Sequence, residues 1–262
     1  MKKFATALGK GAVATVFWVA VWFIIAKIVD LDLILPSPLS VLKSLWQLIK
    51  TVDFWQSTSI SFSRVIIGVI ISLVLGCLLA YLIWRSKILS TLLTPALSII
   101  KATPVASFIV IAWIWFDTSL LPIFISSLIV IPIITANVMQ GISSVDKELI
   151  DVASVYKLPL GKRLFKLYIP SIAPYFIAAC KASLGMAWKA SVAAEMIVLS
   201  KSSIGKAIYE SKIALEASSV FAWTVVIIIL SIVIEKGLLA LLNTVGRSAR
   251  FLPRGGETYA EN

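Results

Sequence analysis

The stretch VIIGVIISLVLGCLLAYLIW, residues Val65–Trp84, carries no charged side chain between Arg64 and Arg85. About 20 consecutive apolar residues are needed for a helix to cross the hydrocarbon core of a bilayer. A backbone in lipid must satisfy its own hydrogen bonds, and a helix does so within one segment. This stretch therefore predicts a transmembrane helix.

Apolar stretches of similar length lie on both sides of Val65–Trp84. They are Ala12–Val29, Leu97–Phe116, Leu120–Met139, Pro174–Leu199 and Phe221–Leu242. The first is longer than the apolar part of a secretory signal and lacks a small-residue cleavage site, so we expect it to be retained. No segment alternates with a period of two as a membrane β-barrel strand does. The sequence predicts an all-α, polytopic membrane protein with about six transmembrane helices.

Composition also indicates that lipid surrounds most of the chain. Hydrophobic residues make up 60% of it, charged residues make up 14%, and the mean hydropathy is +1.00. The formal net charge of +11 does not indicate nucleic-acid binding, because the basic residues lie between apolar spans and form no stripe. The chain has no histidine, and Cys77 and Cys180 both lie in apolar stretches. We therefore expect no metal site and no Ser-His-Asp hydrolase.

The distribution of basic residues predicts the orientation of the spans. With the N-terminus in the cytoplasm, the inner segments hold about twice as many Lys and Arg residues as the outer segments. Both termini are therefore expected on the cytoplasmic side. The predicted parts are a cytoplasmic N-terminus (1–11), a first transmembrane helix (12–29), an extracytoplasmic segment (30–64), a core of five transmembrane helices (65–242) that includes a cytoplasmic loop (141–171), and a cytoplasmic C-terminal tail (243–262).

The extracytoplasmic segment begins with a turn-like entry, Leu35-Pro36-Ser37-Pro38. Apolar residues then recur at helical spacing, namely Leu39, Leu42, Leu45, Trp46 and Ile49. We expect an amphipathic helix that lies on the membrane or on the helical core.

The cytoplasmic loop reads DKELIDVASVYKLPLGKRLFKLYIP from Asp146 to Pro170. Acidic residues, which favour a helix N-terminus, come first, at Asp146, Glu148 and Asp151. A Leu-Pro-Leu-Gly turn ends at Gly161, and a basic amphipathic run follows up to the proline. Ile150, Ala153, Val155 and Leu158 could form an apolar contact face. The residues alone allow two interpretations: a helix pair that docks a soluble partner, or a solvated loop that rests on the bilayer.

This loop resembles the EAA signature of the membrane subunits of binding-protein-dependent ATP-binding cassette (ABC) importers. Asp151, Val152 and Ala153 align with Glu-Ala-Ala, and Pro170 lies at the expected distance. Lys157 stands where the family has glycine. The resemblance implies a coupling helix over about Asp146–Lys157, and without that glycine we expect it to continue to the break at Pro159.

The resemblance extends from Leu35 to Arg254 and points to the nitrate, sulfonate and taurine branch of the family. The similar blocks are Leu35–Pro38, Ser61 with Arg64 and Gly68, Lys101–Pro104, Ser144–Leu149, Ala187–Lys189 and Ala194–Met196. It implies a type I (MetI-like) importer permease fold in a prokaryotic inner membrane. The partners it implies are a second permease copy, two ABC ATPase subunits docked on the loop, and an extracytoplasmic solute-binding protein.

The nucleotide chemistry is expected in another chain. No G-x-x-x-x-G-K-[ST] phosphate loop is present. We therefore expect a transport subunit rather than an enzyme, with no cofactor of its own and with ATP and Mg²⁺ bound by the partner ATPase.

Ionisable residues inside spans usually face protein or water. The hypothesis for the translocation path places Lys189 toward it, with Ser183, Trp188 and Ser191 nearby, so that a cation favours an anionic or polar substrate. Glu195, near the outer end, could help hold an outer gate. The alternative is that Lys189 makes a structural contact between helices, such as an ion pair with Glu195 of a second copy.

The expected function is the permease subunit of an ABC importer for a small anion or organic solute, such as nitrate, a sulfonate or taurine. Two alternatives remain open. One is a secondary active transporter that works without an ATPase, although we find no internal repeat of the kind such proteins often show. The other is an importer of a thiamine- or flavin-related compound.

Overall fold

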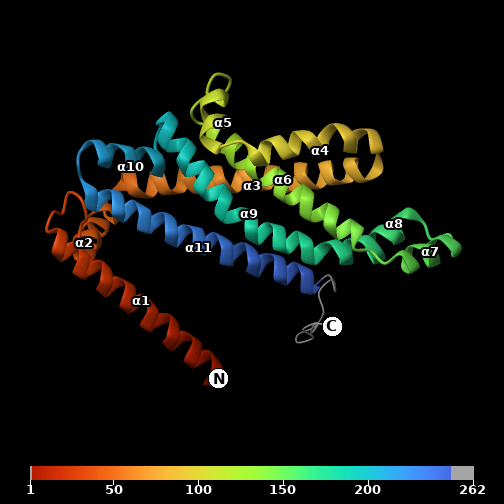
Figure 1. Cartoon of the computed structure of the whole chain (residues 1–262), viewed down its shortest axis with the longest axis horizontal. Helices are drawn as coiled ribbons and strands as arrows, with labels where there is room; N and C mark the ends of the chain where they lie inside the picture. Colours follow the sequence, from red (N-terminus) through yellow and green to blue (C-terminus); the bar gives the residue numbers. More distant parts are fainter. Residues whose placement is uncertain (1, 249–262) are drawn as a thin grey trace.

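The computed structural model describes the backbone of residues 2–248 and most side chains between residues 13 and 240. Part of the predicted tail, residues 249–262, lies outside the described range. All assigned elements in that range are helical (Figure 1). They are α1 (Lys2–Val29), α2 (Pro38–Ile49), α3 (Val52–Arg85), α4 (Lys87–Ala102), α5 (Val105–Ala112), α6 (Leu121–Ser143), α7 (Lys147–Val155), α8 (Leu160–Arg163), a π-helical turn η1 (Leu164–Tyr168), α9 (Ile169–Val198), α10 (Ile204–Ile213) and α11 (Ala217–Ser248).

Helices α3, α6 and α9 form the centre of the bundle, with α6 packed against both of the others. A Cβ at Gly76 would lie 2.8 Å from Ile134 Cβ, and a Cβ at Gly68 would overlap the Ser126 hydroxyl. The Thr135 hydroxyl donates to the Gly76 carbonyl at 3.2 Å. Small residues and hydroxyl-to-backbone bonds are how helices approach closely in lipid. The glycines of α3 therefore fix its distance from α6.

Four helices in the described range are long and apolar enough to cross a membrane. They are Val52–Arg85, Leu121–Ser143, Gly161–Val198 and Ala217–Gly237. The apolar part of α1 with described side chains, Val13–Val29, is shorter. Two predicted boundaries were wrong, because α3 begins at Val52 rather than Val65 and the helix that contains Pro174 begins at Gly161.

The predicted third span, Leu97–Phe116, is not a straight helix. Helices α4 and α5 meet at an angle of 105°. The break falls at Thr103 and Pro104, where Thr103 has the extended ψ of 134°. Proline disfavours helical geometry in the residue before it and lacks an N–H of its own, which explains the bend. The pair forms either a broken span, which would be a fifth crossing, or a re-entrant segment, which would not cross.

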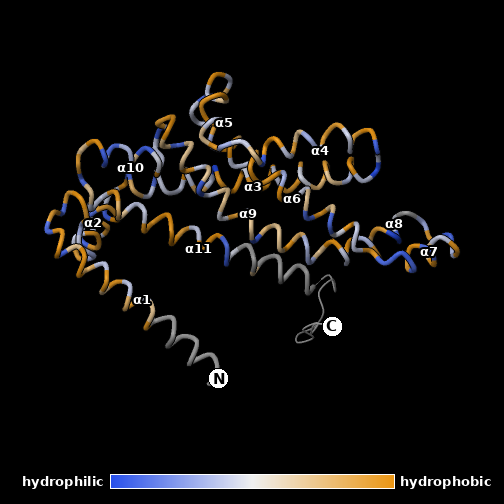
Figure 2. The backbone as a smooth tube through the Cα atoms, viewed as in Figure 1, coloured by the Kyte–Doolittle hydropathy of each residue, from blue (hydrophilic) through white to orange (hydrophobic). Residues whose placement is uncertain are grey.

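Hydrophilic residues gather toward opposite ends of the bundle, at α7–α8 and at α2 and α10 (Figure 2). The predicted amphipathic helix is confirmed as α2, which begins after a Ser37 side-chain cap. Its buried residues are Val41 and Ser44, and Ser44 bonds Ser219 of α11 at 3.1 Å. Most of the predicted apolar stripe faces away from the core, with Leu39, Leu42 and Trp46 exposed.

Candidate functional site

The loop between α6 and α9 folds as the short helix α7, a tight turn and the helix α8. The Asp146 carboxylate accepts a hydrogen bond from the Glu148 amide at 2.9 Å and caps the start of α7. Glu148 adds a second carboxylate in the first turn, where the helix dipole favours negative charge. The acidic start predicted from the sequence is confirmed.

The end of α7 differs from the prediction, because the helix stops at Val155 and does not reach Pro159. Lys157 adopts a left-handed conformation with φ 50°. Its amide donates to the Ser154 carbonyl and the Leu158 amide donates to the Ala153 carbonyl, both at 3.0 Å. These two bonds form a Schellman closure, a helix ending in which glycine is the usual left-handed residue. Lys157 therefore takes up the backbone geometry that the family's glycine would supply.

The guanidinium of Arg163 ties the end of α7 to α8. Arg163 Nε donates to the Leu158 carbonyl at 2.9 Å, and Nη2 donates to the Ala153 carbonyl at 3.0 Å. Ala153 itself is buried at 2% exposure. Sequence reasoning missed this role for Arg163 because the capping side chain comes from the following helix. Gly161 lies in open space, where nothing would contact a Cβ.

This loop projects from one end of the bundle (Figure 1) and carries large apolar side chains that are exposed. Leu149 and Val152 are each 51% exposed, and Val155 and Tyr156 are 78% and 76% exposed. Asp151 is exposed as well. A projecting group of large apolar side chains is typical of a surface that another protein or the membrane covers.

Pro170 does not end the helix that follows the loop. The π-helical turn η1 leads directly into α9, and Ile169 N–H bonds the Leu164 carbonyl. Because Pro170 has no N–H, the preceding turn cannot close with ordinary helical bonds, and a π-helical turn accommodates it. The basic run that ends at Pro170 in the sequence therefore continues as helix into α9.

Lys189 lies on an exposed face of α9, together with Lys181, Ala182, Met186 and Met196. This face lies within the Gly161–Val198 span. A helix rises 1.5 Å per residue, so Lys189 is about 13 Å from the end of α9 at Val198. A hydrocarbon layer about 30 Å thick with its edge at Val198 would have Lys189 near its middle. Its ammonium group therefore needs a polar or protein neighbour beyond this chain.

The residues predicted to accompany Lys189 face inward instead. Ser183, Ser191 and Glu195 are 0% exposed and Trp188 is 1% exposed. Ser183, Ser191 and Glu195 lie four, eight or twelve residues apart, which places them on one side of the helix, about opposite Lys189. In this chain their side chains pack between helices and do not share the Lys189 surface.

Glu195 is the centre of a buried polar network at the end of the bundle away from α7. Its carboxylate accepts hydrogen bonds from Ser61 Oγ at 2.7 Å, Arg64 Nη1 at 3.0 Å and the Gly205 amide at 3.3 Å. The Ile204 amide donates in turn to Ser61 Oγ at 3.0 Å. Because these partners occupy Glu195 within the chain, the alternative pairing with Lys189 of a second copy is not supported.

A bundle with four helices long and apolar enough to cross a membrane, and with a helical loop that projects from one end, is the architecture of a multi-pass membrane protein. Residues 72–243 match the family of binding-protein-dependent transport system inner membrane components. The chain belongs to this family. It is the permease subunit of an ABC importer, a transport subunit and not an enzyme, as the sequence predicted.

Relatives of known name agree with this assignment. The nitrate import permease protein NrtB of Synechococcus elongatus is 30% identical over 191 residues, covering 69% of this chain and 68% of that protein. A Bacillus subtilis protein named as an aliphatic sulfonates transport permease, SsuC, is 25% identical and covers 83% and 79%. The bicarbonate transport system permease protein CmpB of Synechocystis is 28% identical, covering 60% and 56%.

Solved structures of low sequence identity share the fold. A chain of a bacterial alginate ABC transporter, in complex with a periplasmic protein that holds an alginate pentasaccharide, has a TM-score of 0.59 at 16% identity. That match covers 94% of this chain and 96% of the other. A chain of an amino acid ABC transporter has a TM-score of 0.55 at 14% identity, covering 72% and 90%. The predicted ABC permease fold is confirmed, and the alternative of a secondary transporter is set aside.

Proposed function

We propose that two copies of this chain form the translocation path of an importer for a small anion, powered by two ABC ATPases docked on α7 and α8. The observation that carries the proposal is Lys189, an exposed ammonium group nine residues from the end of a helix long enough to cross the membrane. A second copy that covers this face of α9 would remove Lys189 from lipid and place two such cations along one path.

The charge of the path favours anions over the alternative cargoes. The named relatives handle nitrate, aliphatic sulfonates and bicarbonate, which are all anions and otherwise differ in shape. A lysine is a compact point charge that can attract all three without a shaped pocket. Selection among them would then belong to the extracytoplasmic binding protein, and a thiamine- or flavin-related cargo is disfavoured.

The α7–α8 loop is proposed as the element that the ATPase moves. Val152, Val155 and Tyr156 would enter an apolar groove of the ATPase, with Asp151 at the rim. The Schellman turn and the Arg163 bonds hold α7 rigidly to α8, which leads into α9. Movement of the docked helix would therefore reach the span that carries Lys189. ATP and Mg²⁺ would be bound by the ATPase, with both termini of this chain in the cytoplasm.

Transport in proteoliposomes tests the path. Lys189→Met should reduce uptake of the transported anion by about tenfold or more, since one full charge is removed from a low-dielectric path. Lys189→Arg should retain most of the uptake. Lys43→Met is the matched control, because Lys43 is an exposed lysine on α2, away from the proposed path on α9. Unchanged uptake with Lys189→Met would exclude this lysine from the path.

Copurification tests the docking surface. Asp151→Arg should weaken retention of the ATPase on tagged permease, because it reverses the charge beside the exposed apolar face. Asp117→Arg, an identical exchange at an exposed site between α5 and α6, should leave retention unchanged. Equal retention in both variants would show that the ATPase docks elsewhere.

A further inference from the structure

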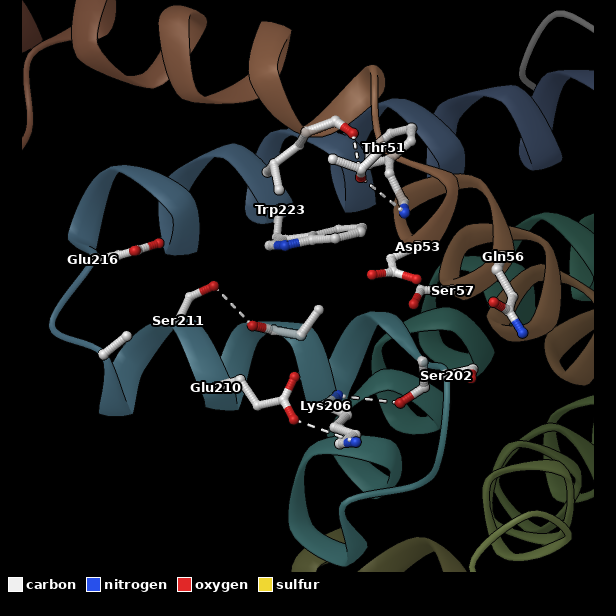
Figure 3. A pocket seen from close by; sticks show the side chains of 15 residues that line it. Thr51, Asp53, Gln56, Ser57, Ser202, Lys206, Glu210, Ser211, Glu216 and Trp223 are labelled. Atoms are coloured by element: carbon white, nitrogen blue, oxygen red, sulfur yellow. Dashed lines mark hydrogen bonds and ion pairs between the residues drawn. The ribbon is translucent and has the colours of Figure 1, made fainter.

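A cavity of about 530 Å³ opens at the end of the bundle opposite the α7–α8 loop. Its walls come from the start of α3, from α10 and from the start of α11 (Figure 3). Under the proposed orientation this end faces the outside of the cell. The cavity is separate from the exposed face of α9 that carries Lys189, since Lys189 does not line it.

The cavity is acidic, although the whole chain has a net charge of +11. Asp53, Glu210 and Glu216 line it, against the single cation Lys206. Lys206 is already paired with Glu210 at 3.2 Å. Glu216 accepts one bond from Ser219 at 3.0 Å, and Asp53 has no ion pair or side-chain hydrogen bond within the described residues. Two carboxylates thus remain without a cationic partner.

A second observation, independent of these charges, also points to a ligand. Ser57 is only 8% exposed, lines the cavity, and its hydroxyl has no hydrogen-bond partner within the described part of the chain. Ser57 and Asp53 point into the same space from neighbouring turns of α3 (Figure 3). A hydroxyl that reaches the cavity without a protein partner, beside a free carboxylate, is suited to accept hydrogen bonds from one donor group.

An aromatic ring completes the lining. Trp223 is 4% exposed, and its indole is held by stacking on Phe54 at a centroid distance of 5.1 Å. The ring lies between the α3 carboxylate and the side chains of α10 (Figure 3). An indole face next to carboxylates attracts an ammonium or guanidinium group through cation–π and charge-assisted bonds. Leu48, Ala207 and Ala214 add apolar wall, which suits the methylene stem of a long basic side chain.

A metal ion fits this lining less well. Within the described residues, no three His, Cys, Asp or Glu side chains are grouped closely enough to hold a metal. The carboxylates stand around a wide space rather than converging on a point. The lining therefore fits an extended organic cation.

The α10 wall is fixed to the centre of the bundle. The Ile204 and Gly205 amides at its start bond Ser61 and Glu195, which belong to α3 and α9. A Cβ at Gly205 would lie 2.5 Å from Glu195 Cβ, so the start of α10 packs closely on α9. A group that enters the cavity would contact α3, α10 and α11 together.

We infer that this cavity receives a lysine or arginine side chain of the extracytoplasmic solute-binding protein. The inference rests on the proposed function, which supplies a binding protein on this face. It assigns an acidic receptor to the permease and predicts a basic residue at the matching point of the binding protein.

The test uses the full transporter in nanodiscs with the binding protein that stimulates the wild-type complex. Asp53→Asn should raise the binding-protein concentration for half-maximal ATPase stimulation about tenfold, because one charge-assisted bond is lost, with the maximal rate restored at saturation. Asp53→Lys should raise it further. Asp32→Asn, the same exchange beyond the other end of α2, should shift it less than about twofold. An unchanged value for both Asp53 variants overturns the inference.

A labelling experiment identifies the occupant. In a Cys77→Ser, Cys180→Ser background, Asp53→Cys is treated with a cationic methanethiosulfonate reagent. The inference is supported if the binding protein protects this cysteine from labelling and free arginine does not. Free arginine is used at about 10 mM, which would saturate a site of millimolar affinity. Protection by arginine alone would make the cavity a small-cation site and overturn it. If no binding protein stimulates ATP hydrolysis by the wild-type complex, the proposed function itself fails. If stimulation is normal but does not respond to changes at Asp53, only the inference about this cavity fails.

Discussion

Replacing Glu195 with alanine would leave the Arg64 guanidinium buried without its carboxylate. Arg64 is 8% exposed and Glu195 is 0% exposed, with 3.0 Å between their charged atoms. Glu195 also accepts bonds from Ser61 and from the Gly205 amide. Breaking a buried ion pair by removing one partner costs about 3–5 kcal/mol. We expect Glu195→Ala to lower the free energy of unfolding by an amount in this range.

A double variant distinguishes the effect of losing the ion pair from the effect of losing side-chain volume. Arg64→Met with Glu195→Met removes both charges while keeping apolar volume, so it should cost much less than the sum of the single methionine variants. The coupling energy from the double-mutant cycle should be about 2 kcal/mol. Denaturant-induced unfolding in detergent, followed by tryptophan fluorescence, measures all four proteins.

The exposed pair Lys206–Glu210 provides the control. Its side chains are 37% and 61% exposed, and such pairs contribute about 0–1 kcal/mol. Glu210→Ala should therefore have a small effect in the same assay. The reasoning would be refuted if Glu195→Ala cost no more than Glu210→Ala, or if the Arg64–Glu195 cycle gave no coupling.

Three further predictions concern the loop and the packing of α3. Residue 157 has a positive φ, which glycine adopts easily and a β-branched residue does not. Lys157→Gly should therefore stabilise the loop by about 1 kcal/mol, and Lys157→Val should destabilise it. Hydrogen exchange of the α7 amides should be slower in the first variant and faster in the second. Arg163→Ala should remove two bonds to the end of α7 and increase exchange of the Leu158 amide, whereas unchanged exchange would mean that the turn holds without the guanidinium. Gly76→Leu should destabilise the protein by several kcal/mol, since a Cβ there would lie 2.8 Å from Ile134. Gly185→Leu should not destabilise an isolated chain, because a Cβ at Gly185 would have no neighbour within 4 Å. Equal thermal unfolding temperatures for the two variants would contradict this prediction.

Membrane embedding could be predicted because hydrophobicity is a local property of the sequence. Val65–Trp84 needed no partner to be recognised, and α3 contains all of it. Its true start at Val52 was missed because polar residues such as Thr58 and Ser61 look like loop but are buried in the helical bundle. The interruption at Pro104 was visible in the sequence, but the direction of the bend depends on α6 and α9, which α5 contacts.

The candidate site divides in the same way. The helix start at Asp146 follows from local capping rules and was correct. The Arg64–Glu195 pair joins residues 131 positions apart, so spacing alone could not find it. The grouping of Ser183 and Ser191 with Lys189 was wrong because proximity in sequence was taken for a shared face of the helix, although Lys189 itself is exposed.

The left-handed turn at Lys157 has a consequence for how the loop is recognised. A docking partner that contacts α7 meets a shape set by dihedral angles, and lysine and glycine can both give that shape at this position. A loop taken from a relative that has glycine at the position of Lys157 should therefore keep the same backbone conformation in this permease. Discrimination between cognate and foreign ATPases would then lie in the outward side chains Val152, Val155 and Tyr156, which could be exchanged without redesigning the turn.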